Sequence, residues 1–271
     1  MPGNHETPVT QYRQPVTVER MTGDLARLGV EPGDIVLVHT AMSRIGWICG
    51  GTQAAIDALR AAVGPHGTLV MPAHSMDVTD PAHWSHPPVP RDWQPIIRDA
   101  MPAYDPERTP TRDMGAIAEA FRRWPGTERS RHPAVSFSAN GPDAKAILAH
   151  QPLEDPFGVP SPLSVLYDLN AKVLMIGTGY DTCTGLHLAE RVAWGDRPLR
   201  QPDGAPLMTE HGRCWIDYTL PAHDTEHFDA IGTVLDREGL SRIGSVGYAT
   251  TRLLSLRRIT DRAKVLFPVR S

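Results

Sequence analysis

One segment places a histidine and an acid at a spacing that suits proton transfer. The stretch from Gly177 to Glu190 (GTGYDTCTGLHLAE) follows an apolar strand pattern and passes through a glycine turn into a helical pattern. If Thr184 caps that helix, His187 lies in the first turn, where the helix dipole disfavours imidazolium and keeps the ring usable as a base. Glu190 follows at i+3, so both side chains can share one face. These residues predict a general base.

Other interpretations of this segment remain open. Cys183 lies four residues before His187, a separation that allows a cysteine–histidine nucleophile pair. The chain has 12 histidines, so a packed or surface position is the default for any one of them. His187 and Glu190 could likewise form an ordinary surface pair.

A second segment has the composition of a ligand-binding turn. Residues 39–46 (HTAMSRIG) follow the apolar run 34–38 (DIVLV) and precede a helical pattern at 52–63. Hydroxyl groups, free backbone N–H groups and a helix N-terminus suit a phosphate or a pantetheine amide. The alternative is an ordinary strand–loop–helix connection capped by Thr52.

Two further polar clusters could contact ligands. Residues 129–133 (RSRHP) could hold a nucleotide phosphate, although the pattern by itself favours a solvated basic turn. Residues 217–229 contain acids that could orient a base or bind a cationic amine, or could open a helix at Thr225. His223 and His227 resemble metal ligands, but no complete ligand set with a known spacing follows them, so we expect no metal.

The order of the predicted elements indicates an α/β fold, with a mixed sheet flanked by helices. A strand at 34–38, a helix at 52–63 and a strand at 68–71 predict a parallel βαβ unit. The proline-rich segment 72–112 is predicted to be an ordered binding loop, because such long loops are usually functional or disordered and this one carries tryptophans and histidines. Further helices are predicted at 18–28, 114–124, 142–150, 161–169, 186–194, 225–237 and 248–257, and further strands at 135–138, 172–176, 213–220 and 265–269.

Composition limits the classes of partner. We expect a single domain over residues 1–271, with two lobes, about 16–195 and 196–271, left open. A net charge of −4 argues against nucleic acid or an anionic membrane as the main partner. The three cysteines form no C-x-x-C pair, and the chain has neither a signal-peptide pattern nor an 18-residue apolar run. These features predict a cytoplasmic protein.

Taken together, the motifs resemble the aminoglycoside 3-N-acetyltransferase family. The resemblance rests on LGVEPGDIVLVHTAMSRIG, GGTQAAIDALRAAVGPHGTLVMPA, RSRHPAVSFSANGPDA and SPLSVLYDLNAKVLMIGTGYDTCTGLHLAE, which occur in the family's order over roughly residues 20–195. It implies the family's own antibiotic N-acetyltransferase fold. The loop of the common acetyltransferases, Q/R-x-x-G-x-G/A, is not evident.

The resemblance also implies roles for particular residues. His187 matches the family's catalytic base, and acetyl-CoA is the expected acyl donor. The expected CoA-binding residues are His39, Thr40, Ala41, Ser43, Arg44, Ile45, Gly46, Arg129, Ser130 and His132. Acids expected near an aminoglycoside are Asp77, Asp181, Glu190 and Glu226, and Asp224 is expected to orient His187.

The expected reaction is direct attack of the substrate's 3-amino group on the thioester after His187 removes a proton. The alternatives are an acetyltransferase for another small cationic amine, a Cys183-dependent acyltransferase with a covalent intermediate, and a non-catalytic CoA- or drug-binding protein. The sequence also leaves a homodimer open.

Overall fold

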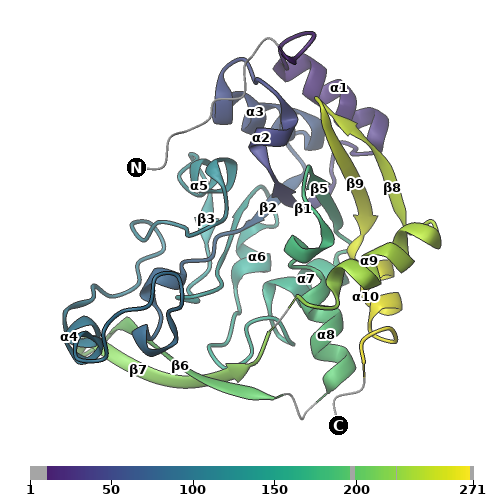
Figure 1. Ribbon diagram of the computed structural model, residues 1–271. Helices are drawn as coiled ribbons and strands as arrows, with labels where there is room; N and C mark the ends of the chain where they lie inside the picture. The colour runs from purple at the N-terminus through teal and green to yellow at the C-terminus, as the bar shows by residue number, and fades with distance from the viewer. Residues whose placement is uncertain (1–10, 196–198, 224, 269–271) are drawn as a thin grey trace.

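A computed structural model describes residues 11–195, 199–223 and 225–268 (Figure 1). Within these ranges, no helix combines the length and the apolar character needed to cross a bilayer. The helices are α1 Val18–Leu28, α2 Met42–Ile45, α3 Gly51–Val63, α4 Trp93–Ala100, α5 Ala116–Arg122, α6 Ala144–Leu148, α7 Pro162–Asp168, α8 Leu186–Trp194, α9 Phe228–Arg237 and α10 Leu256–Ala263, with short 3₁₀ turns η2 Met76–Val78, η3 Pro81–His83 and η4 Tyr180–Thr182. The strands are β1 Ile35–Thr40, β2 Thr68–Pro72, β3 Glu128–Arg129, β4 Phe137–Asn140, β5 Lys172–Ile176, β6 Arg200–Thr209, β7 Gly212–Pro221, β8 Ser241–Val246 and β9 Ala249–Ser255.

Seven strands form one mixed sheet in the order β3-β4-β2-β1-β5-β9-β8. At its centre, β1 runs parallel to both β2 and β5, and Leu37 pairs with Val70 on one side and Val173 on the other. The remaining pairings are antiparallel. The predicted βαβ unit and the mixed sheet are therefore confirmed. Because β8 and β9 add to β5, strands from 16–195 and from 196–271 share this sheet.

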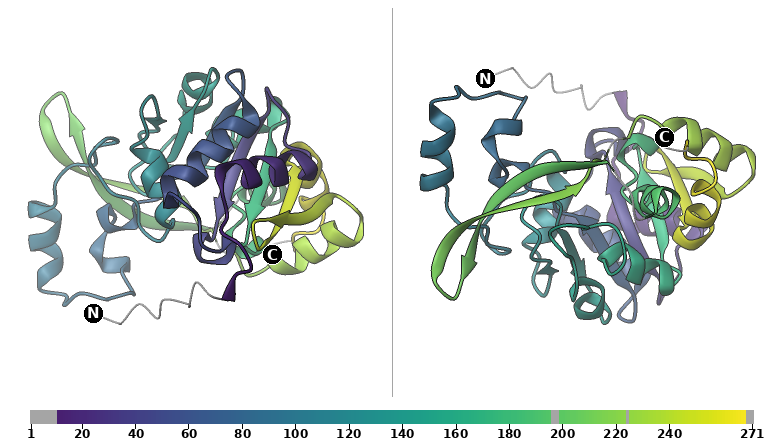
Figure 2. Two further views of the ribbon diagram at one scale, coloured as in Figure 1. Left: turned by 90° about the horizontal axis from the view of Figure 1, so that it is seen from above. Right: turned by 90° about the horizontal axis from the view of Figure 1, so that it is seen from below.

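Helices cover both faces of the sheet (Figure 2). Side chains alternate between the faces of a strand, and β1 follows that rule: Val36 and Val38 pack in one apolar cluster with residues of α1, α3 and α5, whereas Leu37 packs in the other with residues of α6, α7, α8 and α10. A strand buried on both sides needs a continuous apolar run, which is why DIVLV was recognisable from sequence.

Local signals explain the most accurately predicted helices. Thr17 caps α1 by accepting a hydrogen bond from the N–H of Arg20, and Gly29 ends the helix in the left-handed conformation that glycine adopts without steric cost. The predicted bounds 18–28 and 186–194 match α1 and α8. The N-cap of α8 is Gly185 rather than Thr184, which still leaves His187 in the first turn.

The strands β6 and β7 form a separate two-stranded ribbon that extends toward α4 (Figure 1). This ribbon holds the proline-rich segment 72–112 in place. The Tyr104 N–H donates to the carbonyl of Pro206 at 2.8 Å, and the Arg213 guanidinium donates to the carbonyl of Met101 at 2.7 Å. The proline-rich segment contains η2, η3 and α4 and is ordered, as predicted.

Two predictions for the C-terminal quarter are wrong. The helix expected over Tyr248–Arg257 is the strand β9, followed directly by α10, because the segment pairs along its length with β5 and β8. The strand expected over Val265–Val269 is absent from its described residues, 265–268, which form a turn after α10. Strands β6 and β8 were not predicted.

Candidate active site

A cavity of about 320 Å³ lies where the three parallel strands end. Its walls include His39 and Thr40 at the end of β1, His74 beyond β2, Thr178 beyond β5, and His187 on α8. Ligands of α/β proteins bind at the carboxyl ends of parallel strands, and the segments 39–46 and 177–190 each follow a predicted apolar strand. The structure brings these two segments to one cavity.

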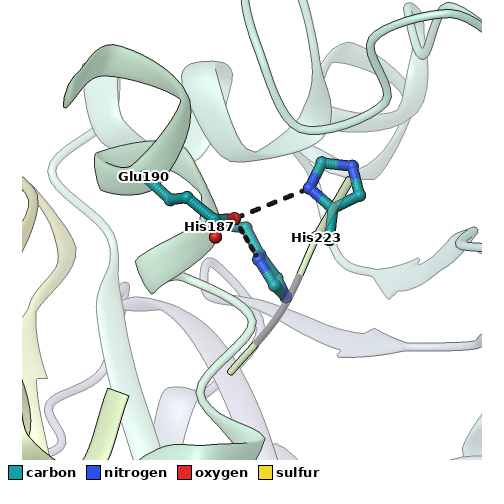
Figure 3. A group of neighbouring side chains, drawn as sticks. All are labelled: His187, Glu190 and His223. Carbon is teal, nitrogen blue, oxygen red and sulfur yellow. Dashed lines mark hydrogen bonds and ion pairs between the residues drawn. The ribbon is translucent and has the colours of Figure 1, made fainter. Parts of the chain in front are cut away.

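His187 is held by an acid one helical turn away. Its Nδ1 lies 2.9 Å from Oε2 of Glu190, within the distance of a charge-assisted hydrogen bond (Figure 3). Helix α8 can begin close to its neighbours because residue 185 is glycine: a Cβ there would lie 2.8 Å from Cδ1 of Leu256. With Nδ1 donating to Glu190, Nε2 is the ring nitrogen that can accept a proton from a substrate in the cavity.

Aromatic side chains fix the plane of the His187 ring. Phe157 stacks on it with ring centroids 4.8 Å apart and an interplanar angle of 5°, and Phe228 packs at 4.9 Å. The His187 side chain is only 11% exposed. A base held in this way loses little conformational freedom when it meets its substrate.

Glu190 is fully buried, which changes the role expected for it. Its exposed fraction is 0%, so its carboxylate contacts His187 and not the open part of the cavity. Burial favours the protonated acid, but the hydrogen bond from His187 and the nearby imidazole of His223 outweigh it and hold the pKa of Glu190 below its usual value. Glu190 therefore has the position of an orienting carboxylate, a role the sequence assigned to Asp224, and it is too deep to bind substrate directly. Asp224 lies outside the described residues.

His223 is a second histidine on the same carboxylate. It follows β7, and its Nδ1 lies 3.6 Å from Oε2 of Glu190 (Figure 3). Burial lowers the pKa of its imidazole, which favours the neutral form of the ring. The sequence placed His223 in an acidic stretch but did not connect it with Glu190, because only the folded chain brings β7 and α8 together.

Two further neutral histidines lie in the cavity wall. Burial, followed by repulsion from His187, lowers the pKa of His39 to about 4 and that of His74 to about 3. Nε2 of each ring and Oγ1 of Thr178 are buried without a hydrogen-bond partner among the described residues. Buried polar groups normally have partners, so this wall is suited to hydrogen bonding with a bound molecule. His74 was not predicted as a site residue.

The predicted CoA-binding segment 39–46 lies only partly in the cavity. His39 and Thr40 line it, whereas Ile45 is 0% exposed and packs in the core. Among the other predicted residues, Ala41 occupies the N-cap position of α2 and Gly46 packs beside Tyr248. Ser43 and Arg44 are exposed.

The polar atoms of Arg129, Ser130 and His132 are used inside the protein. The Arg129 guanidinium donates to the carbonyls of Ala73 and Thr109 and to two serine hydroxyls. Ser130 and His132 are buried, and His132 Nδ1 accepts backbone N–H groups 3.2 and 3.1 Å away. These contacts connect the 105–112 loop to the sheet and disfavour a direct contact of the three residues with CoA.

The predicted substrate acids lie at different places. Asp181 is exposed and lines the first cavity. Asp77 lines a second cavity of about 720 Å³ and forms an ion pair with Arg112 at 2.6 Å. Asp113, which was not predicted, lines both cavities, so they adjoin. Glu226 is exposed and lines neither.

Cys183 lies in the apolar core beneath the site. It is 0% exposed, and burial raises the pKa of its thiol to about 12. A cysteine nucleophile reacts as the thiolate, which this environment suppresses. The covalent alternative therefore has no support in the geometry.

These features define an α/β protein with a histidine–glutamate pair facing a cavity at the sheet edge, and sequence comparison identifies the family. The profile of the aminoglycoside 3-N-acetyltransferase family matches residues 37–268. The chain is 41% identical over 254 residues to the SPbeta prophage-derived aminoglycoside N(3')-acetyltransferase-like protein YokD of Bacillus subtilis, covering 93% of both chains. It is 38% identical to aminoglycoside N(3)-acetyltransferase IX of Micromonospora chalcea, covering 88% of this chain and 89% of that one. The chain belongs to this family.

Solved structures share the whole fold. The crystal structure of YokD from Bacillus subtilis superposes with a TM-score of 0.92 at 40% identity, covering 95% of each chain. AAC-IIIb in binary complex with CoASH gives a TM-score of 0.82 at 33% identity, covering 93% of this chain and 96% of that one. AAC-VIa bound to sisomicin gives 0.83 at 28% identity, covering 93% and 97%. The expected family and its fold are thus confirmed.

Proposed function

We propose that this protein transfers the acetyl group of acetyl-CoA to the 3-amino group of an aminoglycoside, with His187 as the general base and Glu190 as its orienting acid. The observation that carries the proposal is the 2.9 Å contact between His187 and the buried Glu190, on a ring that also lines the cavity. Relatives that bind CoASH and sisomicin share the fold over most of their length.

The first step is the deprotonation of the amine. An ammonium group has no lone pair and cannot attack a thioester, so the substrate nitrogen must lose a proton. Nε2 of His187 accepts this proton, and the ionised Glu190 stabilises the imidazolium that forms. General base catalysis of this kind contributes about 10²–10⁴-fold to the rate.

The amine then attacks the thioester carbonyl directly. The carbonyl oxygen becomes an oxyanion, and the C–S bond breaks when the tetrahedral intermediate collapses. The attacking nitrogen then gives up its second proton, the departing CoA thiolate takes up one proton to become the thiol, and the proton held by His187 passes to solvent, which restores the base. We propose that the segment from Thr40 to Ser43 supplies donors for the oxyanion and that neighbouring residues of 39–46 hold the CoA. His39, His74 and Thr178 are neutral and have polar atoms at this wall with no partner in the described part of the chain, so they can hydrogen-bond the reactants without adding charge.

Carboxylates attract the cationic acceptor toward the base. Asp181 lies in the first cavity, Asp77 in the second, and Asp113 in both. Arg112 pairs with Asp77 at 2.6 Å and with Asp113 at 3.3 Å, which reduces the negative charge available for a polycation. This pairing favours one alternative, a small amine with fewer positive charges.

Product analysis tests the proposal. The protein is mixed with acetyl-CoA and sisomicin, with sisomicin already acetylated at its 3-amino group as the matched control, and the products are identified by mass spectrometry and NMR. We expect one acetyl group on the 3-nitrogen of sisomicin and none on the blocked control. Acetylation of small monoamines but not of sisomicin would favour the alternative acceptor, and CoA binding without any acetyl transfer would contradict the enzymatic proposal.

A further inference from the structure

Three side chains beneath the cavity point their donor atoms at one place. His187 and Glu190 come from α8, and His223 comes from the segment after β7 (Figure 3). Each residue offers one possible metal-binding atom: an imidazole nitrogen from each histidine and a carboxylate oxygen from Glu190. These three atoms lie within 4.8 Å of one another. The proposed reaction uses His187 and Glu190 but gives no task to His223.

Several polar atoms of this cluster have no hydrogen-bond partner among the residues that the structure describes. Both nitrogens of His223 and Oε1 of Glu190 are buried without a hydrogen bond from the described residues, and the 3.6 Å approach of His223 Nδ1 to Oε2 is too long for one. The Glu190 side chain is 0% exposed. Leaving such atoms unpaired costs free energy, and a bound cation between them would remove that cost.

The spacing of the donors is close to that of a zinc site. Zinc binds imidazole nitrogen and carboxylate oxygen at about 2.0–2.2 Å, so neighbouring ligands of a tetrahedral ion lie about 3.4 Å apart. The Glu190 oxygen lies 2.9 Å from His187 Nδ1 and 3.6 Å from His223 Nδ1. Shifts of about half an ångström or less would bring these two distances to the tetrahedral value, and the two histidine donor atoms, which lie within 4.8 Å of each other, would have to close to the same separation. Two histidines and a glutamate are also a known zinc ligand set, with a fourth position open to water or substrate.

We propose that His187, Glu190 and His223 form a binding site for Zn²⁺ and that occupancy of this site switches the enzyme off. The sequence alone predicted no metal, because the ligands come from two segments 33 residues apart, counted from Glu190 to His223, and follow no recognised spacing. Inhibition rests on the proposed function, whereas metal binding does not.

Inhibition follows from the proton on the His187 ring. In the metal-free protein, Nδ1 carries the proton and donates to Glu190, which leaves the lone pair of Nε2 free. A metal on Nδ1 needs the lone pair of that nitrogen, so the proton of the neutral ring moves to Nε2. The nitrogen that would accept the substrate proton then already carries one, and base catalysis stops.

Calorimetry with Zn²⁺ tests the site without any acetyl transfer. Tag-free full-length protein is freed of metal with a chelator, dialysed and titrated with Zn²⁺, and Co²⁺ is added in parallel to record the absorption of a tetrahedral complex. We expect one saturable site, with an affinity about tenfold or more lower in His223→Ala. His227→Ala, four residues away and outside the cluster, is the matched control and should bind like the wild type. Cys49→Ser excludes binding by the exposed thiol.

The outcomes separate the two proposals. Wild-type protein that binds no Zn²⁺, or a His223→Ala variant that binds as tightly, overturns the metal site. His223→Gln, which preserves side-chain volume, replaces His223→Ala if the latter does not fold. Inhibition is measured as acetylated product by mass spectrometry, because Zn²⁺ also binds the CoA thiolate and would disturb a thiol-release assay. We expect Zn²⁺ to inhibit the wild type reversibly and to inhibit His223→Ala much less. Zn²⁺ binding with no acetyl transfer in any variant would refute the proposed function and leave the site standing.

Discussion

Two carboxylates that the sequence treated alike, Glu190 and Asp77, lie in opposite environments. Glu190 on α8 is 0% exposed and contacts His187, whereas the Asp77 side chain in the proline-rich segment is 57% exposed and contacts Arg112. Electrostatic interactions strengthen as water is excluded and weaken at the surface. We therefore expect a buried carboxylate to orient the base in one region and an exposed carboxylate to adjust affinity in the other.

This contrast assigns different kinetic effects to the two regions. Changes at α8 alter the group that takes the proton in the transition state, so they should lower kcat. Changes in the 72–112 segment alter the field around a bound amine, so they should move KM. A variant of α8 that changed only KM, or a variant of the 72–112 segment that changed only kcat, would contradict this assignment.

The largest effect is expected for His187→Ala. Without the imidazole, the remaining histidines of the cavity wall, His39 and His74, are weak bases because their pKa values are lowered to about 4 and about 3, so kcat should fall by about a hundredfold or more. CoA binding, measured by calorimetry, should be retained because the ring is assigned to the acceptor amine. Near-normal turnover in this variant would remove His187 from the mechanism.

Glu190→Gln should have the next largest effect. The amide keeps the volume of the side chain but cannot balance an imidazolium, so kcat should fall by about tenfold or more while KM changes little. Steady-state kinetics at saturating acetyl-CoA measures both values. If only KM rose, Glu190 would belong with the substrate acids and the contrast with Asp77 would disappear.

A pair of variants at the second cavity should give smaller, opposite effects. Arg112→Gln releases Asp77 and Asp113 to face the amine and should lower the KM for sisomicin. Asp77→Asn leaves Arg112 without its closest partner and should raise that KM. Exposed ion pairs suggest changes of about two- to fivefold, with kcat unaffected. Movement of KM in the same direction in both variants would contradict the assignment.

Cys183→Ala is expected to have the smallest kinetic effect. The thiol is fully buried and its pKa is raised to about 12, so it is not available as a nucleophile. The variant should lose some stability through the cavity that it creates, yet turn over like the wild type. Mass spectrometry of the wild type during turnover should show no acetylated protein, and an acetyl group on Cys183 would restore the covalent alternative.

The sequence predicted those parts of the fold whose signals are local. Strand β1 shows a continuous apolar run, and α1 has its cap at Thr17 and its stop at Gly29. Strand β6 contains Pro202, Gly204 and Pro206, which locally indicate a loop. It is a strand only because β7 pairs with it, and β9 is likewise fixed by its pairing with β5. Such contacts between distant segments leave no local pattern.

The candidate site shows the same limit. His187 and Glu190 could be linked from their i+3 spacing on one helix. The packing of Phe157 on His187 and the approach of His223 to Glu190 depend on chain segments 30 or more residues away, counted from Phe157 to His187 and from Glu190 to His223. Nothing in the sequence indicated that Glu190 is fully buried beside His187 or that the guanidinium of Arg129 is used in hydrogen bonds within the protein.

The position of the proton on His187 tests the account most directly. Protein with ¹⁵N-labelled histidine is studied by NMR in the presence of a chelator at the pH of the activity assay, and the His187 signals are assigned by their loss in His187→Gln. The account predicts a protonated Nδ1 that donates to Glu190 and an unprotonated Nε2. A neutral ring with its proton on Nε2, or a doubly protonated ring, would contradict it.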